Sequence, residues 1–379
     1  MADLNVNSIG DASGGNTATI NGYAPTLSNM AGRNLIINGD MRIDQRNAGA
    51  SSALTSGYVT VDRWRGSTNN KTSVLTIQQN AGSVTPPAGF TNYLGITVTT
   101  EQASLSSDTA VRLLHRIEGF NTADLAFGTA SASSVTLSFW VRSSITGLYG
   151  VYLTNSTSDR QYVASYTINT ANTWEYKTIT IPGDTMGTWL TNNETGILVG
   201  FALVAGTSRQ TTPGSWVETD TEAPTGQTNL TETNGATWYL TGVQLEAGSV
   251  ATPFEHVDYG EMLRRCQRYC EVIRPSGATT YAQIAIGQSY TATAAQVGYF
   301  YQTAKRSQPT VTYDTASKYV LLNASDGAVA CSSIQTGRSD VTSLAINAVV
   351  GSNTFTAGHA NRLLANNTDI PVTIISAEL

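Results

Sequence analysis

The sequence predicts an all-β protein: one β-sandwich, a second and smaller C-terminal β-sandwich, and one short α-helix that joins them. Only 13% of the 379 residues are charged, against roughly 25% in average globular proteins. Gly, Ser, Thr and Asn are abundant, and Thr suits strands whereas the other three suit tight turns. Short alternating apolar segments recur between clusters of turn residues, a spacing typical of antiparallel β-structure.

Residues 1–32 contain almost no large apolar side chains. A segment of this composition cannot bury enough surface to fold alone, so we predict an extended N-terminal arm. Short strand-like fragments at residues 4–6 and 17–20 favour pairing with a neighbouring sheet. A floppy terminus has the same composition and remains the alternative.

Residues 33–257 contain successive strand candidates, and their spacing indicates a sandwich or barrel. Residues 135–141 alternate between apolar and polar side chains, with Trp140 as the one aromatic residue on the polar side. Residues 197–204 form a continuous apolar run, which predicts a central strand covered on both faces. Residues 238–246 complete this series of strands.

Residues 258–274 form the predicted linking helix, because apolar side chains recur there at four-three-four spacing. Asp258 is placed to cap the first turn, and Pro275 stops the helix. The apolar seam packs either against a sandwich or against the same helix in neighbouring subunits. The candidate residues for this oligomer or domain interface are Met262, Cys266, Tyr269 and Ile273.

In residues 275–379, apolar side chains again recur at every second position, which predicts the second sandwich. The inward-facing residues are expected to be Ala282/Ile284/Ile286, Val297/Tyr299/Tyr301, Ile346/Ala348/Val350 and Ile370/Val372/Ile374.

Charge and composition argue against several classes of partner. The net charge of −6 disfavours nucleic acid, since that affinity depends on Lys and Arg at phosphates. No run of about 18 apolar residues is present, so membrane insertion is not expected. Three cysteines are too few and too irregularly spaced for a disulfide framework, which favours assembly in a reducing cytoplasm.

Motifs of the common catalytic classes are missing, and we predict no catalytic residue and no cofactor. Cys266 and Cys270 share a helical face but lack two further zinc ligands, so core packing is the better interpretation and the metal question stays open. Seven clustered carboxylates have two interpretations. They act in glycoside hydrolysis, or they keep the surface soluble and bind structural calcium. They are Asp159, Glu175, Asp184, Glu194, Glu218, Asp220 and Glu222.

Aromatic side chains suggest a second kind of site, because sugar rings stack on Trp and Tyr. Trp174 and Tyr176 share a strand face with Thr178 and Thr180, which leaves open an exposed aromatic platform. Core packing or a subunit interface is the alternative. The candidate glycan-binding residues are Trp174, Tyr176, Trp189 and Trp216.

Several motifs, in order, resemble those of bacteriophage tail-fibre and receptor-binding virion proteins. The first is residues 34–47 (NLIINGDMRIDQRN), followed by 62–64 (DRW). The middle motifs are residues 173–175 (TWE), 181–184 (IPGD) and 187–189 (GTW). The last are residues 238–248 (WYLTGVQLEAG), 251–255 (ATPFE) and 266–269 (CQRY). The resemblance therefore extends over about residues 34–269.

This resemblance implies a jelly-roll domain related to carbohydrate-binding modules, within a homotrimeric appendage. The resulting hypothesis is a tail fibre whose arm, residues 1–32, attaches to other virion proteins of the tail, adaptor, neck or capsid. The virion would assemble in the bacterial cytoplasm, and the protein would bind host-surface polysaccharide non-covalently. The alternatives are a capsid or neck decoration protein (a head fibre) with a structural role, and a polysaccharide depolymerase.

Overall fold

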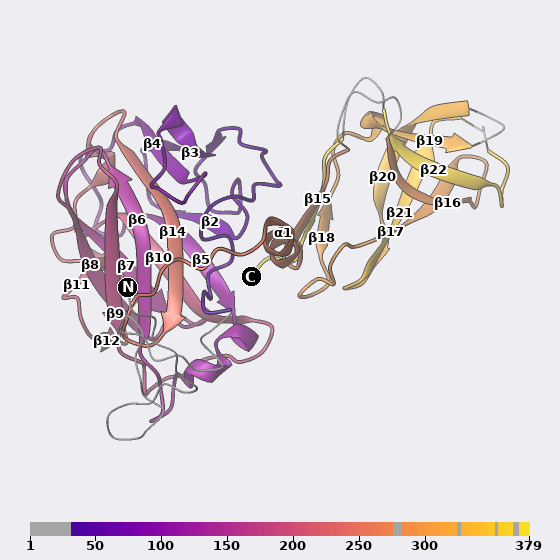
Figure 1. The fold of residues 1–379 in the computed structure, drawn as a ribbon. Coiled ribbons are helices and arrows are strands. Elements are labelled where there is room, and N and C mark those ends of the chain that lie inside the picture. Colours follow the sequence, from indigo (N-terminus) through magenta and orange to yellow (C-terminus); the bar gives the residue numbers. More distant parts are fainter. Residues whose placement is uncertain (1–31, 276–281, 324–326, 353–354, 367–370) are drawn as a thin grey trace, which may run out of the picture. The chain divides into compact units, whose positions relative to one another are not determined.

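The computed structural model describes residues 32–275, 282–323, 327–352, 355–366 and 371–379 (Figure 1). The described residues form two compact units, the first from residues 32–42 and 49–257 and the second from residues 43–48 and 258–379. Apart from residue 32, the predicted arm lies outside the described residues. No helix in the described ranges is long and apolar enough to cross a membrane.

The first unit is a β-sandwich of two six-stranded antiparallel sheets. The first sheet has the order β1 (Ser52–Ala53), β3 (Val74–Gln79), β4 (Leu94–Thr100), β14 (Thr237–Ala247), β6 (Val135–Ser143) and β9 (Glu175–Ile181). The second sheet has the order β12 (Trp216–Val217), β8 (Gln161–Ile168), β7 (Gly147–Thr154), β10 (Thr195–Ala205), β5 (Ala110–Glu118) and β2 (Trp64–Asn69). A short parallel pair joins β11 (Gln210–Thr211) to β13 (Ala223–Pro224).

The core of this sandwich is built from the inward faces of both sheets. Phe201 on β10 is fully buried, and its ring lies 5.1 Å from that of Phe139 and 5.7 Å from that of Trp238 on the opposite sheet. Every residue of β10 is buried, which confirms the predicted central strand. The strands predicted at 135–141 and 238–246 are β6 and β14.

The motif that begins at residue 34 is held to the sandwich by buried polar side chains. The Asn34 amide donates to the Val243 carbonyl at 3.0 Å, and its oxygen accepts from the Leu245 amide at 3.2 Å. Asn38 donates to the Asp62 carbonyl at 3.0 Å. Polar residues thus recur in this motif because they anchor an irregular segment to strand β14 and to the turn before β2.

In the second unit six strands close into a barrel, and three more form a small sheet. The barrel contains β16 (Gln283–Ser289), β17 (Ala294–Phe300), β21 (Ser343–Val350), β20 (Gly327–Ser339), β19 (Tyr319–Asn323) and β22 (Ala360–Ala365). The small sheet contains β15 (Cys270–Ile273), β23 (Thr373–Ser376) and β18 (Thr310–Thr312). The predicted all-β class is confirmed, and alternation alone does not distinguish this barrel from a sandwich because both have one inward face.

Short 3-10 turns complete the described elements, at Ala81–Ser83, Gly119–Asn121, Ala123–Leu125, Thr207–Arg209, Leu230–Glu232 and Ala316–Lys318.

The one α-helix in the described ranges, α1, covers Tyr259–Gln267. Asp258 caps it as predicted, accepting from the Gly260 amide at 2.9 Å. The predicted extent of 258–274 is too long, because Cys270–Ile273 pair with β23 as strand β15. That pairing partner lies about a hundred residues later, so the local apolar spacing gives no sign of it.

Three inward-facing residues predicted in the C-terminal region, Ile286, Val372 and Ile374, are also wrong. Ile286 is 60% exposed, because a β-bulge between Gln283 and Ala285 shifts the alternation of β16 by one residue. In β23 the buried positions are Thr373 and Ile375, whereas Ile374 is only half-buried. Ile370 lies outside the described residues.

Candidate functional site

An open groove of about 500 Å³ lies on the outer face of the first sheet of the sandwich. Trp140 on β6 faces outward, since its neighbours Phe139 and Val141 are fully buried in the core. Tyr176 stands directly opposite on β9 and is 44% exposed, and the two ring centroids lie 5.3 Å apart. Phe254 and His256 belong to the same lining. We call this surface the aromatic groove.

Gly242 on β14 allows the rings of the aromatic groove to come close together. Its φ of +61° is a left-handed conformation that favours glycine, and it sits in a β-bulge. A Cβ at this position would lie 2.7 Å from Phe90 and 3.1 Å from Trp140. The glycine therefore leaves space for Phe90 above the sheet, where its ring centroid lies 5.1 Å from that of Phe254.

The aromatic groove combines ring faces with polar groups, because the Tyr176 hydroxyl and the His256 imidazole also belong to its lining. Aromatic rings provide flat apolar surfaces, and the polar groups orient a ligand by hydrogen bonds. A pyranose ring has the same two characters, with apolar C–H faces and a polar edge. The groove is therefore chemically suited to a neutral oligosaccharide.

Of the four predicted glycan-binding residues, Tyr176 alone lines the aromatic groove. Trp174 packs against Tyr93, and its indole N–H donates to the Thr85 carbonyl at 2.9 Å. Trp189 and Trp216 contact each other at 5.4 Å, and both indole N–H groups donate to backbone carbonyls. These three side chains are half-buried packing residues, and a glycan contact by them stays a prediction.

A second cleft, of about 340 Å³, lies on the outer face of the second sheet. Its floor includes an apolar row, Leu114 on β5 and Tyr152 on β7, with Gly200 between them on β10. Tyr152 lies over Gly200, where a Cβ would come within 2.3 Å of its ring. Charged side chains surround this floor: four arginines and two carboxylates line the cleft. We call it the arginine cleft.

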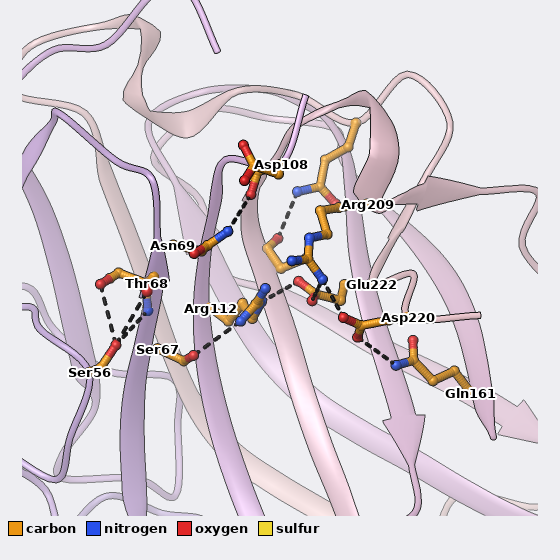
Figure 2. A network of polar contacts seen from close by, with 12 residues as sticks. Ser56, Ser67, Thr68, Asn69, Asp108, Arg112, Gln161, Arg209, Asp220 and Glu222 are labelled. Carbon is orange, nitrogen blue, oxygen red and sulfur yellow. Dashed lines mark hydrogen bonds and ion pairs between the residues drawn. The ribbon is translucent and has the colours of Figure 1, made fainter. Parts of the chain in front are cut away.

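The carboxylates of the arginine cleft are held by arginines and amides (Figure 2). Glu222 forms an ion pair with Arg112, which also donates to the Ser67 hydroxyl at 3.1 Å. Asp220 forms an ion pair with Arg209 and accepts from the Gln161 amide at 3.2 Å. Burial raises the pKa of Glu222, although Arg112 opposes this. These contacts fix the orientation of the carboxylates.

The other carboxylates considered for hydrolysis have structural partners. Asp184 is 1% exposed and accepts two hydrogen bonds from Arg160, both at 2.7 Å. Arg160 also contacts Glu218 at 3.3 Å. Asp159 accepts from Thr157 at 2.8 Å, and Glu175 accepts from the Asn169 amide at 2.8 Å. None of these contacts places a carboxyl pair across an open cleft.

The predicted interface residues lie in the second unit. Met262, Cys266 and Tyr269 are buried at 3% exposure or less, and Ile273 packs against the core of the barrel. Their burial within a single chain favours a packing role, and a contact with another subunit stays a prediction.

Histidines and cysteines form no metal site in the described part of the chain, where no three His, Cys, Asp or Glu side chains gather. His115 is fully buried, its Nε2 lies 3.0 Å from the Ile37 carbonyl, and burial lowers its pKa well below the usual range. His256 lies in the aromatic groove, whereas His359 is in the second unit.

Sequence reasoning missed most of the aromatic groove and all the arginines of the cleft. One signal was present, since Trp140 interrupts the polar side of its strand. Phe90 and Phe254 lie in irregular segments 164 positions apart, and only the fold brings their rings together.

No family model and no curated protein matches the chain. Among solved structures, the enzymatically active domain of tailspike protein 4 from bacteriophage CBA120 matches 49% of this chain and 19% of its own, at 11% identity and a TM-score of 0.28. TmCBM61, in complex with β-1,4-galactotriose, matches 57% of this chain and 99% of its own, at 13% identity and a TM-score of 0.29. The family 11 carbohydrate-binding module from Clostridium thermocellum, in complex with a mixed-linked tetrasaccharide, matches 54% and 98%, at 13% identity and a TM-score of 0.25.

Proposed function

We propose that this chain is a structural protein of a phage particle, a tail fibre or similar appendage that binds host-surface glycan without cleaving it. The observation that carries the binding proposal is the aromatic groove, where Tyr176 and Trp140 present adjacent rings on an open sheet face. The virion location rests on the ordered motifs between residues 34 and 269. The arm, residues 1–32, would attach the protein to the particle.

The contribution of one groove to binding is modest. Burying part of a tyrosine ring against a sugar contributes about 1–2 kcal/mol at roughly 25 cal/mol per Å², or about tenfold in Kd. Weak sites become effective when they are linked, and three in one homotrimer raise avidity by about 10²–10⁴. We therefore propose a trimer, for which light scattering on the purified chain should give three chains per particle.

Adsorption competition tests the proposal. Purified protein is added to host cells before the parent phage, and free phage is counted against time. The wild-type protein should block adsorption, and Tyr176→Ala should block it only at a concentration at least about tenfold higher, because every site of the trimer is weakened. Thr178→Ala is the matched control, since Thr178 is exposed on the same strand but is not part of the groove lining.

The opposite outcome is equally informative. If folded wild-type protein leaves adsorption unchanged at saturating concentration, the glycan-binding proposal is wrong. A decoration protein of the capsid or neck would then be the better interpretation.

A further inference from the structure

The arginine cleft carries more positive charge than its own carboxylates balance. Four arginines line it, and its two carboxylates, Asp220 and Glu222, form ion pairs with Arg112 and Arg209. Two arginines, Arg65 and Arg116, are left over. In a chain with a net charge of −6 and only 13% charged residues, this local excess runs against the overall composition.

Strand pairing places these two arginines next to each other. Arg65 on β2 stands directly opposite Leu114 on β5, so it lies diagonally between Arg112 and Arg116, which flank Leu114 on the same face. Diagonal neighbours on paired strands are close enough for long side chains to interact. Burial and the neighbouring positive charges of Arg116 and Arg112 lower the pKa of Arg65.

Within the described part of the chain, Arg65 and Arg116 have no carboxylate partner. Both side chains are half-buried, and the Nε of Arg116 is enclosed without any hydrogen-bond acceptor. An enclosed donor with no acceptor is costly, and two like charges side by side add repulsion. An anion placed between the two guanidinium groups at the cleft would relieve this repulsion.

We infer that Arg65 and Arg116 form a binding site for the oxyanion group of an acidic sugar, a carboxylate or a sulfate ester, on the sheet opposite the aromatic groove. Guanidinium groups match planar or tetrahedral oxyanions through paired N–H donors. The apolar floor of Leu114 and Tyr152 accommodates the face of the sugar that carries the anion. This inference rests on the proposed glycan binding and adds the class of glycan, an acidic polysaccharide.

Isothermal titration of the 379-residue chain with three tetrasaccharides tests the inference. Tetragalacturonate supplies carboxylates, a κ-carrageenan tetrasaccharide supplies sulfate esters, and galactotetraose is neutral. At least one charged probe should bind about tenfold more tightly than the neutral one, and the tighter of the two identifies the oxyanion. Raising the salt should weaken only the charged probes, since it screens the ion pairs.

Arginine variants then locate the site. Arg65→Gln with Arg116→Gln should remove the preference for the charged probe, whereas the corresponding lysine pair should keep part of it because lysine retains the charge without the paired donors. Arg362→Gln, at an exposed position in the second unit, is the matched control and should change nothing. Thermal melts check that the variants fold. We expect no loss of stability, because the substitutions remove the repulsion between the two arginines.

Two results would overturn the inference. Charged probes that bind no better than the neutral one show that the cleft does not select anions. A preference for charged probes that persists in the double glutamine variant shows that the anion binds elsewhere. Both results are distinguishable from failure of the proposed function, because adsorption competition and its Tyr176→Ala variant address the aromatic groove separately.

Discussion

Substituting Gly242 with alanine tests whether the bulge on β14 shapes the aromatic groove. A left-handed φ of +61° costs a residue with a Cβ about 1–2 kcal/mol. The new Cβ would also lie 2.7 Å from Phe90, against an optimal carbon separation of roughly 3.5–4.0 Å. The Phe90 ring must therefore move by about 1 Å. With the cost of this displacement, the first unit should lose about 2–4 kcal/mol and melt about 5–10 °C lower.

Calorimetry measures the melting temperature, and adsorption competition measures the concentration that halves phage adsorption. Because displaced Phe90 narrows the groove, that concentration should rise about three- to tenfold. Gly235→Ala is the matched control, since φ is +80° there and nothing lies within 4 Å of its Cβ. It should share the conformational cost and leave adsorption unchanged. Equal effects of the two substitutions on both measurements would refute the contact with Phe90.

Three further predictions concern the second unit. Lys305→Met should destabilise this unit by about 3–5 kcal/mol, because the substitution leaves a buried charge without its partner. The Lys305 ammonium lies 2.6 Å from the Glu271 carboxylate, and both groups are almost fully buried. An unchanged urea midpoint for this unit would contradict the expectation. Hydrogen bonds from two arginines on α1 lower the pKa of Glu261 to about 2, so its stabilising effect is complete above about pH 4.5 and disappears as the pH falls toward 2. Glu261→Gln should flatten the loss of stability over that range, and an identical acid profile would exclude this contribution. Burial raises the pKa of the Cys331 thiol to about 12, so iodoacetamide at pH 8 should label it only in urea; peptide mass spectrometry that finds native labelling would count against this burial.

The regular part of the fold was predictable because it depends on local patterns. The apolar run that became β10 and the cap at Asp258 are visible in the sequence itself. The errors occur where a distant strand partner or an extra residue in a bulge determines the local structure. Cys270–Ile273 are a strand because β23 pairs with them, and Ile286 is exposed because of a bulge. Neither cause leaves a trace in the local periodicity.

The candidate sites were less predictable because each is assembled across strands or from irregular segments. Trp140 and Tyr176 lie 36 positions apart, and only the pairing of β6 with β9 makes their rings neighbours. Arg65 and Arg116 are 51 positions apart and are adjacent only through the register of β2 and β5. Residue types restrict what a site does, but the sheet register decides which side chains form it.

The features assigned to binding are also the ones that the fold does not need. The sandwich core is closed by Phe201 and its neighbours, and the buried asparagines of the first motif have their hydrogen bonds satisfied. In contrast, aromatic rings left open on a sheet face and an arginine pair without carboxylates are both unfavourable for the free protein. Both lie on outer sheet faces, where a plain polar surface would serve folding better. Because proteins retain such costs mainly where binding or catalysis requires them, these two faces are the first places to look for the ligand.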